Sequence, residues 1–405
     1  MSKKVLVFSI ATVFITLGTI AGIFYLRGFR LDTKNQALAR TGLLVINSTP
    51  DGAQVFLDGR LTSATDTTIT FLTPKKYQLK LAKEGFTAWE KEVEVRPDLT
   101  TEVAAVLFPA IPDLRPITYT GAVNPKVSPD GTKIVYGIPR GEKAGLWVID
   151  MNDRPFGIGG THVQIVKNTQ QLDFTTANLF WSPDSAQILA QISLLGGKTE
   201  SAKRNYLLKA DKINENLIDG TASLQATLTS WQQDINLKEQ ARILRLRKDL
   251  PELASESGKL LTKVLANATQ SASFLPSFEP DKLFWSPNET RFFFQKLSDV
   301  KNPFGAGVAV YRIRDPNPLK TTPAKFDIGG AKQIIWYPDS DHLIMIEDGK
   351  ISIVEYEGTN KVQIFTGPFE DSFVYPAPNG SKLVILTNFN QESGTLPNLY
   401  TINLR

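Results

Sequence analysis

Two kinds of hydrophobic pattern divide the chain. From Val5 to Leu26 there are 22 residues without a charged side chain. At about 1.5 Å per residue, a helix of this length crosses the hydrocarbon core of a bilayer. From Gly42 onward, apolar and polar residues alternate in short runs, which is the period of half-buried β-strands. The pattern therefore predicts one N-terminal apolar helix followed by a mainly β chain.

The apolar helix has the features of an uncleaved signal anchor. Two lysines precede it, and Arg27 and Arg30 follow it. A cleaved signal peptide, the alternative, has a shorter apolar region and a small-x-small site close behind it. The candidate site here, residues 37–39, lies more than ten residues past the run. We expect residues 1–30 to form a single-pass anchor with the bulk of the chain outside the cell, although the balanced flanking charges do not themselves determine sidedness.

Residues 42–108 are predicted to form a small β-sandwich, which follows a polar spacer at 31–41. Its strands are expected at Leu43–Asn47, Ala53–Leu57, Thr67–Phe71, Lys76–Ala82, Trp89–Val95 and Thr101–Leu107. Turn sequences separate these strands, and we assign Pro50, Gly52 and Gly59 structural roles in the turns.

This part of the chain carries a family resemblance. The turn Pro50-Asp51-Gly52-Ala53, the hairpin Asp58-Gly59 and the later Lys83-Glu84-Gly85-Phe86 occur in the order found in PEGA domains, and the region resembles that family. The family's turn reads P-E-G-A, so Asp51 departs from it. The resemblance implies a surface-exposed interaction or spacer module, suspected of contacting cell-envelope glycans, and it implies no chemistry.

A turn motif recurs five times in the rest of the chain. In each copy an apolar residue ends one strand, proline fixes φ, an Asp or Asn side chain bonds back to the backbone, and an apolar run begins the next strand. The motif prolines are Pro129, Pro183, Pro287, Pro338 and Pro378, and the aspartates that follow three of them are Asp130, Asp184 and Asp339. We assign these residues structural roles in the turns.

The spacing of the motif predicts a β-propeller over residues 117–405. The prolines are separated by 54, 104, 51 and 40 residues, and four-stranded blades repeat at about 40 to 50 residues. Five blades are favoured and six are the alternative, with residues 117–123 expected to complete the last blade as an outer strand. The S-P-D-G copies resemble TolB-type propeller repeats.

The 104-residue gap is predicted to hold a helical hairpin at about 222–268. Apolar residues fall at helical spacing from Leu224 to Leu244, Pro251 interrupts the pattern, and a second helical stretch follows. The first helix carries the densest basic cluster of the chain, formed by Lys238, Arg242, Arg245, Arg247 and Lys248. The cluster is either a contact surface for anionic lipid or wall polymer or simply a solvated helix face.

A proline-rich linker at 109–116 is expected between the sandwich and the propeller. The full order of anchor, PEGA-like sandwich, linker and propeller with a helical insertion resembles that of PEGA-domain membrane proteins of candidate-phylum bacteria. That resemblance brings no assigned activity with it.

Composition excludes several kinds of chemistry. The chain has no cysteine, which excludes disulfides and thiolate sites, and its net charge of +4 includes no long basic run of the kind that binds nucleic acid. Of its two histidines, His162 follows a glycine pair and His342 occupies a turn position that we expect to be exposed. The motif aspartates recur once per blade and cannot converge on one site. We therefore predict no catalytic residue, no cofactor and no metal site.

The sequence favours a non-enzymatic, membrane-anchored binding or scaffolding protein of the cell envelope, whose propeller recognises a protein or glycan partner. One alternative is a propeller enzyme that acts on envelope carbohydrate through carboxylates in the channel. The other is a structural subunit of an envelope complex that docks through the helical hairpin.

Overall fold

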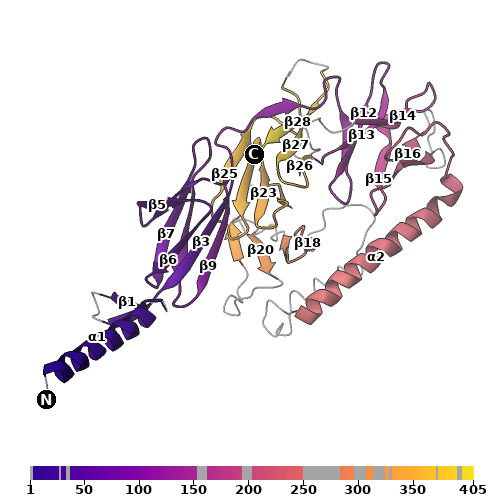
Figure 1. The fold of residues 1–405 in the computed structure, drawn as a ribbon. Helices are drawn as coiled ribbons and strands as arrows, with labels where there is room; N and C mark the ends of the chain where they lie inside the picture. Colours follow the sequence, from indigo (N-terminus) through magenta and orange to yellow (C-terminus); the bar gives the residue numbers. More distant parts are fainter. Residues whose placement is uncertain are drawn as a thin grey trace. The chain divides into compact units, whose positions relative to one another are not determined.

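The protein is mainly β, as the sequence predicted. The computed structural model describes residues 3–26, 29–32, 37–152, 162–193, 203–249, 283–295, 307–312, 324–327, 331–370, 373–389 and 395–405. Its described part contains two long helices, α1 (Lys3–Leu26) and α2 (Leu224–Asp249), among many short strands (Figure 1). The chain divides into two compact units, Met1–Ile111 and Pro112–Arg405.

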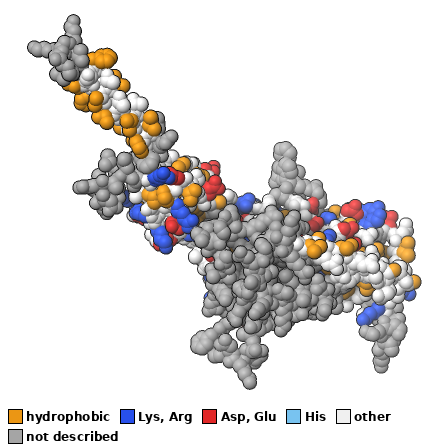
Figure 2. All heavy atoms as spheres, turned by 90° about the horizontal axis from the view of Figure 1, so that it is seen from below, with side chains coloured by type: hydrophobic (Ala, Val, Ile, Leu, Met, Phe, Trp, Pro, Cys, Tyr) orange, Lys and Arg blue, Asp and Glu red, His pale blue; other side chains and the backbone are white. Residues whose placement is uncertain are grey.

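The apolar run forms α1. Within it Phe8–Tyr25 is long and apolar enough to cross a membrane, and none of it is buried. Figure 2 shows hydrophobic side chains exposed along this helix. The residues expected as a spacer are more ordered than predicted, because β1 (Phe29–Asp32) pairs antiparallel with β2 (Ala37–Arg40).

Two sheets form the sandwich of the first unit. The strands are β3 (Gly42–Thr49), β4 (Gln54–Leu57), β5 (Arg60–Ala64), β6 (Thr67–Leu72), β7 (Lys75–Ala82), β8 (Trp89–Val95) and β9 (Thr100–Val106). They are ordered β6-β3-β9 in one sheet and β5-β4-β7-β8 in the other. Leu44 and Ile46 of β3 pack with Val55, Leu79 and Leu81 of the other sheet, and all five side chains are buried. Strand β5 was not predicted, because its exposed residues show no apolar alternation.

Five antiparallel sheets lie in the described part of the second unit. Their strands are β10 (Leu114–Pro116), β11 (Val123–Val127), β12 (Lys133–Ile138), β13 (Gly145–Asp150), β14 (His162–Lys167), β15 (Asn178–Trp181), β16 (Gln187–Ser193), β17 (Lys203–Lys209), β18 (Leu283–Trp285), β19 (Arg291–Gln295), β20 (Gly307–Arg312), β21 (Ala324–Asp327), β22 (Gln333–Trp336), β23 (His342–Glu347), β24 (Lys350–Glu355), β25 (Val362–Thr366), β26 (Val374–Pro376), β27 (Lys382–Thr387) and β28 (Asn398–Asn403). Four sheets follow the chain in simple order, β11 to β14, β15 to β17, β18 to β21 and β22 to β25, and the last has the order β10-β28-β27-β26.

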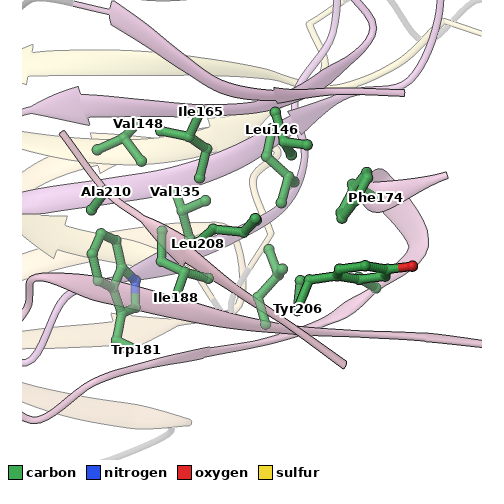
Figure 3. Close-up of a cluster of buried hydrophobic side chains, with 14 of the residues drawn as sticks. Val135, Leu146, Val148, Ile165, Phe174, Trp181, Ile188, Tyr206, Leu208 and Ala210 are labelled. Carbon is green, nitrogen blue, oxygen red and sulfur yellow. The ribbon is translucent and has the colours of Figure 1, made fainter. Parts of the chain in front are cut away.

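The first of these sheets packs against a neighbour on each face. Val135 of β12 joins a cluster with Ile188 and Leu208 of the second sheet (Figure 3). Ile134, the adjacent residue, joins a different cluster with Val384 of the last sheet. Side chains alternate between the faces of a strand, so β12 contributes to both cores. Face-to-face packing that brings the first sheet against the last is the arrangement of a β-propeller, and the number of blades stays a prediction.

The ring is closed by a strand that lies earlier than expected. Leu114–Pro116, within the predicted linker, forms β10 and pairs with β28, so the placement of the closing strand at 117–123 was wrong. The segment that follows keeps contact with the chain end, since Ile117 N–H donates to Leu399 O at 2.7 Å. A three-residue strand whose partner lies near residue 400 leaves no local hydrophobic pattern.

Helix α2 occupies the position predicted for the insertion. It begins at Leu224, after a short 3₁₀ turn at Thr221–Ser223, and ends at Asp249. Trp231 on one face is buried. The second helix of the predicted hairpin lies outside the described residues.

Candidate functional site: the repeat turns and the inserted helix

The five repeat turns share one backbone geometry. The residue after the Asp or Asn has a left-handed backbone in every copy, with φ of 72° at Gly131, 58° at Ser185, 55° at Glu289, 66° at Ser340 and 70° at Gly380. The Asp or Asn Oδ1 accepts the backbone N–H two residues further on, at 2.8 to 3.0 Å. Each of these side chains therefore serves its own turn.

Serine completes the turn in the first three copies. Ser128 Oγ donates to Asp130 Oδ1 at 2.6 Å and accepts the N–H of Lys133 at 2.9 Å. At Asp184, the hydrogen bond from the Ser182 hydroxyl and the N–H of Ala186 hold the pKa of the carboxyl below its usual value. A carboxylate whose Oδ1 accepts both of these hydrogen bonds is a structural acceptor within its own turn.

Tryptophans at the start of two motifs connect neighbouring sheets. Trp181 Nε1 donates to Lys126 O in the first sheet at 3.1 Å, and Trp336 Nε1 donates to Phe284 O at 2.8 Å. These bonds join copies 1 to 2 and 3 to 4 in the same way, and both indole rings are buried. Each of these two indoles therefore links its sheet to the preceding one.

Helix α2 contacts copies 2 and 3 of the motif through two of its basic residues. Lys238 Nζ donates to Pro183 O at 3.2 Å. Arg242 Nε donates to Glu289 Oε1 at 2.9 Å, and its guanidinium lies 5.9 Å from the ring centroid of Trp285. The side chains of Arg245, Arg247 and Lys248, the other members of the predicted basic surface, are outside the described set.

His342 is buried, so the expectation of an exposed turn position was wrong. Its side chain folds back onto its own turn, where Nδ1 lies 2.7 Å from Asp339 Oδ2, and the residue is 4% exposed. The ring also meets Tyr337 edge-on at 6.1 Å. Burial acts to raise the pKa of Asp339, but the hydrogen bond and charge of His342 and two backbone N–H groups outweigh it and lower that pKa.

The other predicted residues also have structural partners. His162 begins β14, where its Nδ1 lies 2.8 Å from the hydroxyl of Tyr136. In the sandwich, Gly52 and Gly59 have φ of 69° and 79°, as turn glycines do. Among the residues that the structure describes, no group of three or more His, Asp or Glu side chains is placed to hold a metal ion.

Comparison with known proteins identifies the first module. Residues 41–110 match the model of the PEGA domain. No curated protein matches the chain. The second module is compared with solved structures, and its propeller assignment rests on its own strand order and packing because the similarities are low.

Three solved structures illustrate these similarities. A protein assigned as TolB from Agrobacterium tumefaciens is 15% identical, with 75% of this chain and 76% of that chain covered and a TM-score of 0.22. The TolB of Acinetobacter baumannii is 11% identical, with 82% and 60% covered and a TM-score of 0.23. The oligogalacturonate lyase of Vibrio parahaemolyticus is 8% identical, with 93% and 96% covered and a TM-score of 0.28.

Proposed function

We propose that this chain is a membrane-anchored, non-enzymatic binding or scaffolding protein of the cell envelope, which holds a β-propeller outside the membrane to recognise a protein or glycan. The observation that carries the proposal is the order of modules: an apolar helix with a membrane-length segment of which nothing is buried precedes a sandwich that matches the PEGA domain. In chain order the sandwich lies between this helix and the propeller.

The repeat turns support a binding role over catalysis. In all five copies the Asp or Asn side chain accepts a backbone N–H of its own turn. Carboxylates of the repeats are therefore engaged in maintaining the blades. Recognition would fall to the loops that the repeats do not share.

Protease treatment of intact cells tests the placement. The full chain, carrying an epitope after Arg405, should lose the epitope when protease is added to intact cells. Protection on intact cells, with digestion after lysis, would overturn the extracytoplasmic placement. Recognition is tested with the detergent-solubilised chain as bait for envelope glycans and envelope proteins, and with an unrelated propeller as control. Retention no greater than that of the control would contradict the binding role.

Docking through α2 is the second candidate function. Leu237 and Leu244 are 65% and 64% exposed and lie seven residues apart, which places them on one face of the helix. A photo-crosslinking residue at Leu237 should capture a discrete envelope protein, whereas one at the exposed Gln225, about 120° around the same helix, should not. Equal capture from both positions would remove this candidate.

A further inference from the structure

The sandwich exposes three large apolar side chains, and two of them lie at one of its two ends. Among residues 41–110, all of which the structure describes, these side chains are Leu61, Phe71 and Leu99, which are 61%, 47% and 53% exposed. They belong to three different elements: Leu61 is the second residue of β5, Phe71 is next to last in β6, and Leu99 lies in the turn between β8 and β9.

Strand pairing brings Phe71 and Leu99 to the same end. In one sheet, Gly42 at the start of β3 pairs with Leu72 at the end of β6, and β9 begins beside β3 at Thr100. Leu61 lies away from this end, because it pairs with Phe56, and Phe56 pairs with Lys80, five residues along β7 from its first residue. The opposite end, with its turns at 50–53, 65–66 and 83–88, exposes none of the large apolar side chains of residues 41–110.

The chain enters the sandwich from α1 at this same end. Gly42 opens β3 there, and only 15 residues separate it from Leu26. Arg40, just before β3, forms an ion pair with Asp98 at 2.6 Å, beside Leu99. The ring of Tyr25, in the last turn of α1, has its centroid 6.4 Å from that of Phe71. Aromatic residues at the end of a membrane span are characteristic of the bilayer interface.

Phe71 also has an unusual backbone. Its φ is 58°, a left-handed conformation that is a genuine outlier for an aromatic residue. Strained positions of this kind persist where the surrounding structure imposes them, and they gather at sites with a function beyond the fold. Here the consequence is a phenyl ring that is left half exposed at the end of an edge strand.

The charges at this end are already paired within the chain. Arg40, Lys75 and Arg96 form ion pairs with Asp98, Asp58 and Glu94. Neutralised charges among exposed apolar side chains fit the headgroup and acyl boundary of a bilayer better than they fit a strongly anionic partner. The short connection to α1 keeps the end within reach of the bilayer.

We propose that Phe71 and Leu99 form a membrane-seating surface, through which the sandwich rests on the lipid and enters the interfacial region of the bilayer. The proposal rests on the anchoring of α1 that is part of the proposed function. The sandwich would then be oriented by direct contact with lipid as well as by its tether.

Because the chain has no cysteine, a single introduced cysteine can be labelled specifically. The full chain is prepared as Leu99→Cys and, as controls, Leu61→Cys in β5 and Glu84→Cys at the exposed turn of the opposite end. Each variant is labelled with an environment-sensitive fluorophore and reconstituted in phosphatidylcholine vesicles with or without lipids spin-labelled near the headgroup. The label at 99 should shift to shorter emission wavelength and lose intensity with the spin-labelled lipid, and the labels at 61 and 84 should do neither.

Flotation of the vesicles separates the possible failures. A chain that does not float with vesicles lacks the anchor, and both this proposal and the proposed function then fail. A chain that floats, but whose label at 99 behaves like the labels at 61 and 84, overturns the seating surface alone. A blue shift without lipid-dependent quenching would assign this end to a protein contact and would also overturn it.

Discussion

Gly131 and Gly380 occupy equivalent places in two repeat turns but differ in what surrounds them. Their φ values are 72° and 70°. A Cβ on Gly131 would have no atom within 4 Å, whereas one on Gly380 would lie 2.7 Å from the Tyr337 hydroxyl oxygen and 2.9 Å from its Cζ. That hydroxyl donates to Gly380 O, and Tyr337 is 1% exposed. Alanine variants at the two glycines therefore separate the backbone cost of the turn from the packing cost against Tyr337.

The expected costs differ clearly. In Gly131→Ala, the left-handed backbone strain destabilises the fold by about 1 to 2 kcal/mol. The stiffer unfolded chain offsets about 0.4 to 1 kcal/mol of this, so the free energy of unfolding should fall by about 1 kcal/mol. Gly380→Ala carries the same cost, and forcing a methyl group against a buried ring adds about 1 to 3 kcal/mol. We expect a total loss of about 3 kcal/mol in the free energy of unfolding for Gly380→Ala.

Urea unfolding of the full chain in mild detergent measures both variants. Five of the six tryptophans lie in residues 112–405, so tryptophan fluorescence reports mainly on this unit. The cost of Gly380→Ala should fall in a Tyr337→Phe background, because the hydroxyl that the methyl group meets is gone. Equal costs for the two alanine variants, or no change in that background, would refute the role assigned to the contact between Tyr337 and Gly380.

Further predictions concern the other contacts of the repeats. Trp336→Phe should lower the free energy of unfolding by about 1 kcal/mol in the same assay, because the indole N–H bond to the neighbouring sheet is lost, and an unchanged midpoint would contradict that bond. The pKa of Asp339 is lowered, so its contribution to stability is present above pH about 4 and is lost as the pH falls through the folded value. Asp339→Asn should therefore be less stable than the parent chain at pH 7, and this difference should shrink at pH 3, whereas a constant difference would exclude the linkage. Arg242→Gln should cost about 1 kcal/mol or less, since the side chains of the ion pair with Glu289 are 33% and 29% exposed, and a double-mutant cycle with Glu289→Gln should return most of that cost as coupling.

The sequence predicted those parts of the fold that local chemistry encodes. Pro183 and Asp184 set a turn with residues no more than a few positions away, so the repeat is readable along the chain. Strand β10 is three residues long and pairs with β28 at the other end of the unit, and no local pattern carries that information. The burial of His342 was missed for a different reason: its contacts with Asp339 and Tyr337 are local, but the other copies carry Lys, Gln or Arg at this position and so indicated exposure.

In copies 1 and 3 of the motif, a basic side chain donates a hydrogen bond to the turn of the next copy. Lys133 Nζ donates to Ser185 O at 3.1 Å, and Arg291 Nη1 donates to Ser340 O. In both cases the serine hydroxyl also accepts a backbone N–H of the preceding turn, at 3.2 and 3.1 Å. A basic residue in one turn and a serine in the next thus form a repeated link between sheets.

Copies 2 and 3 have different residues at the positions that form this link. The helical insertion lies between these two copies. Gln187 occupies the place of the basic residue in copy 2, and Glu289 occupies the place of the serine in copy 3. Helix α2 supplies cations to the same two turns, Lys238 to the carbonyl of Pro183 and Arg242 to the carboxylate of Glu289. Two side chains of the predicted basic surface are therefore engaged within the chain. Recognition of an anionic polymer by this helix would have to compete with those contacts, which weakens the basic-surface hypothesis and favours the apolar face of α2 as its outward-facing feature.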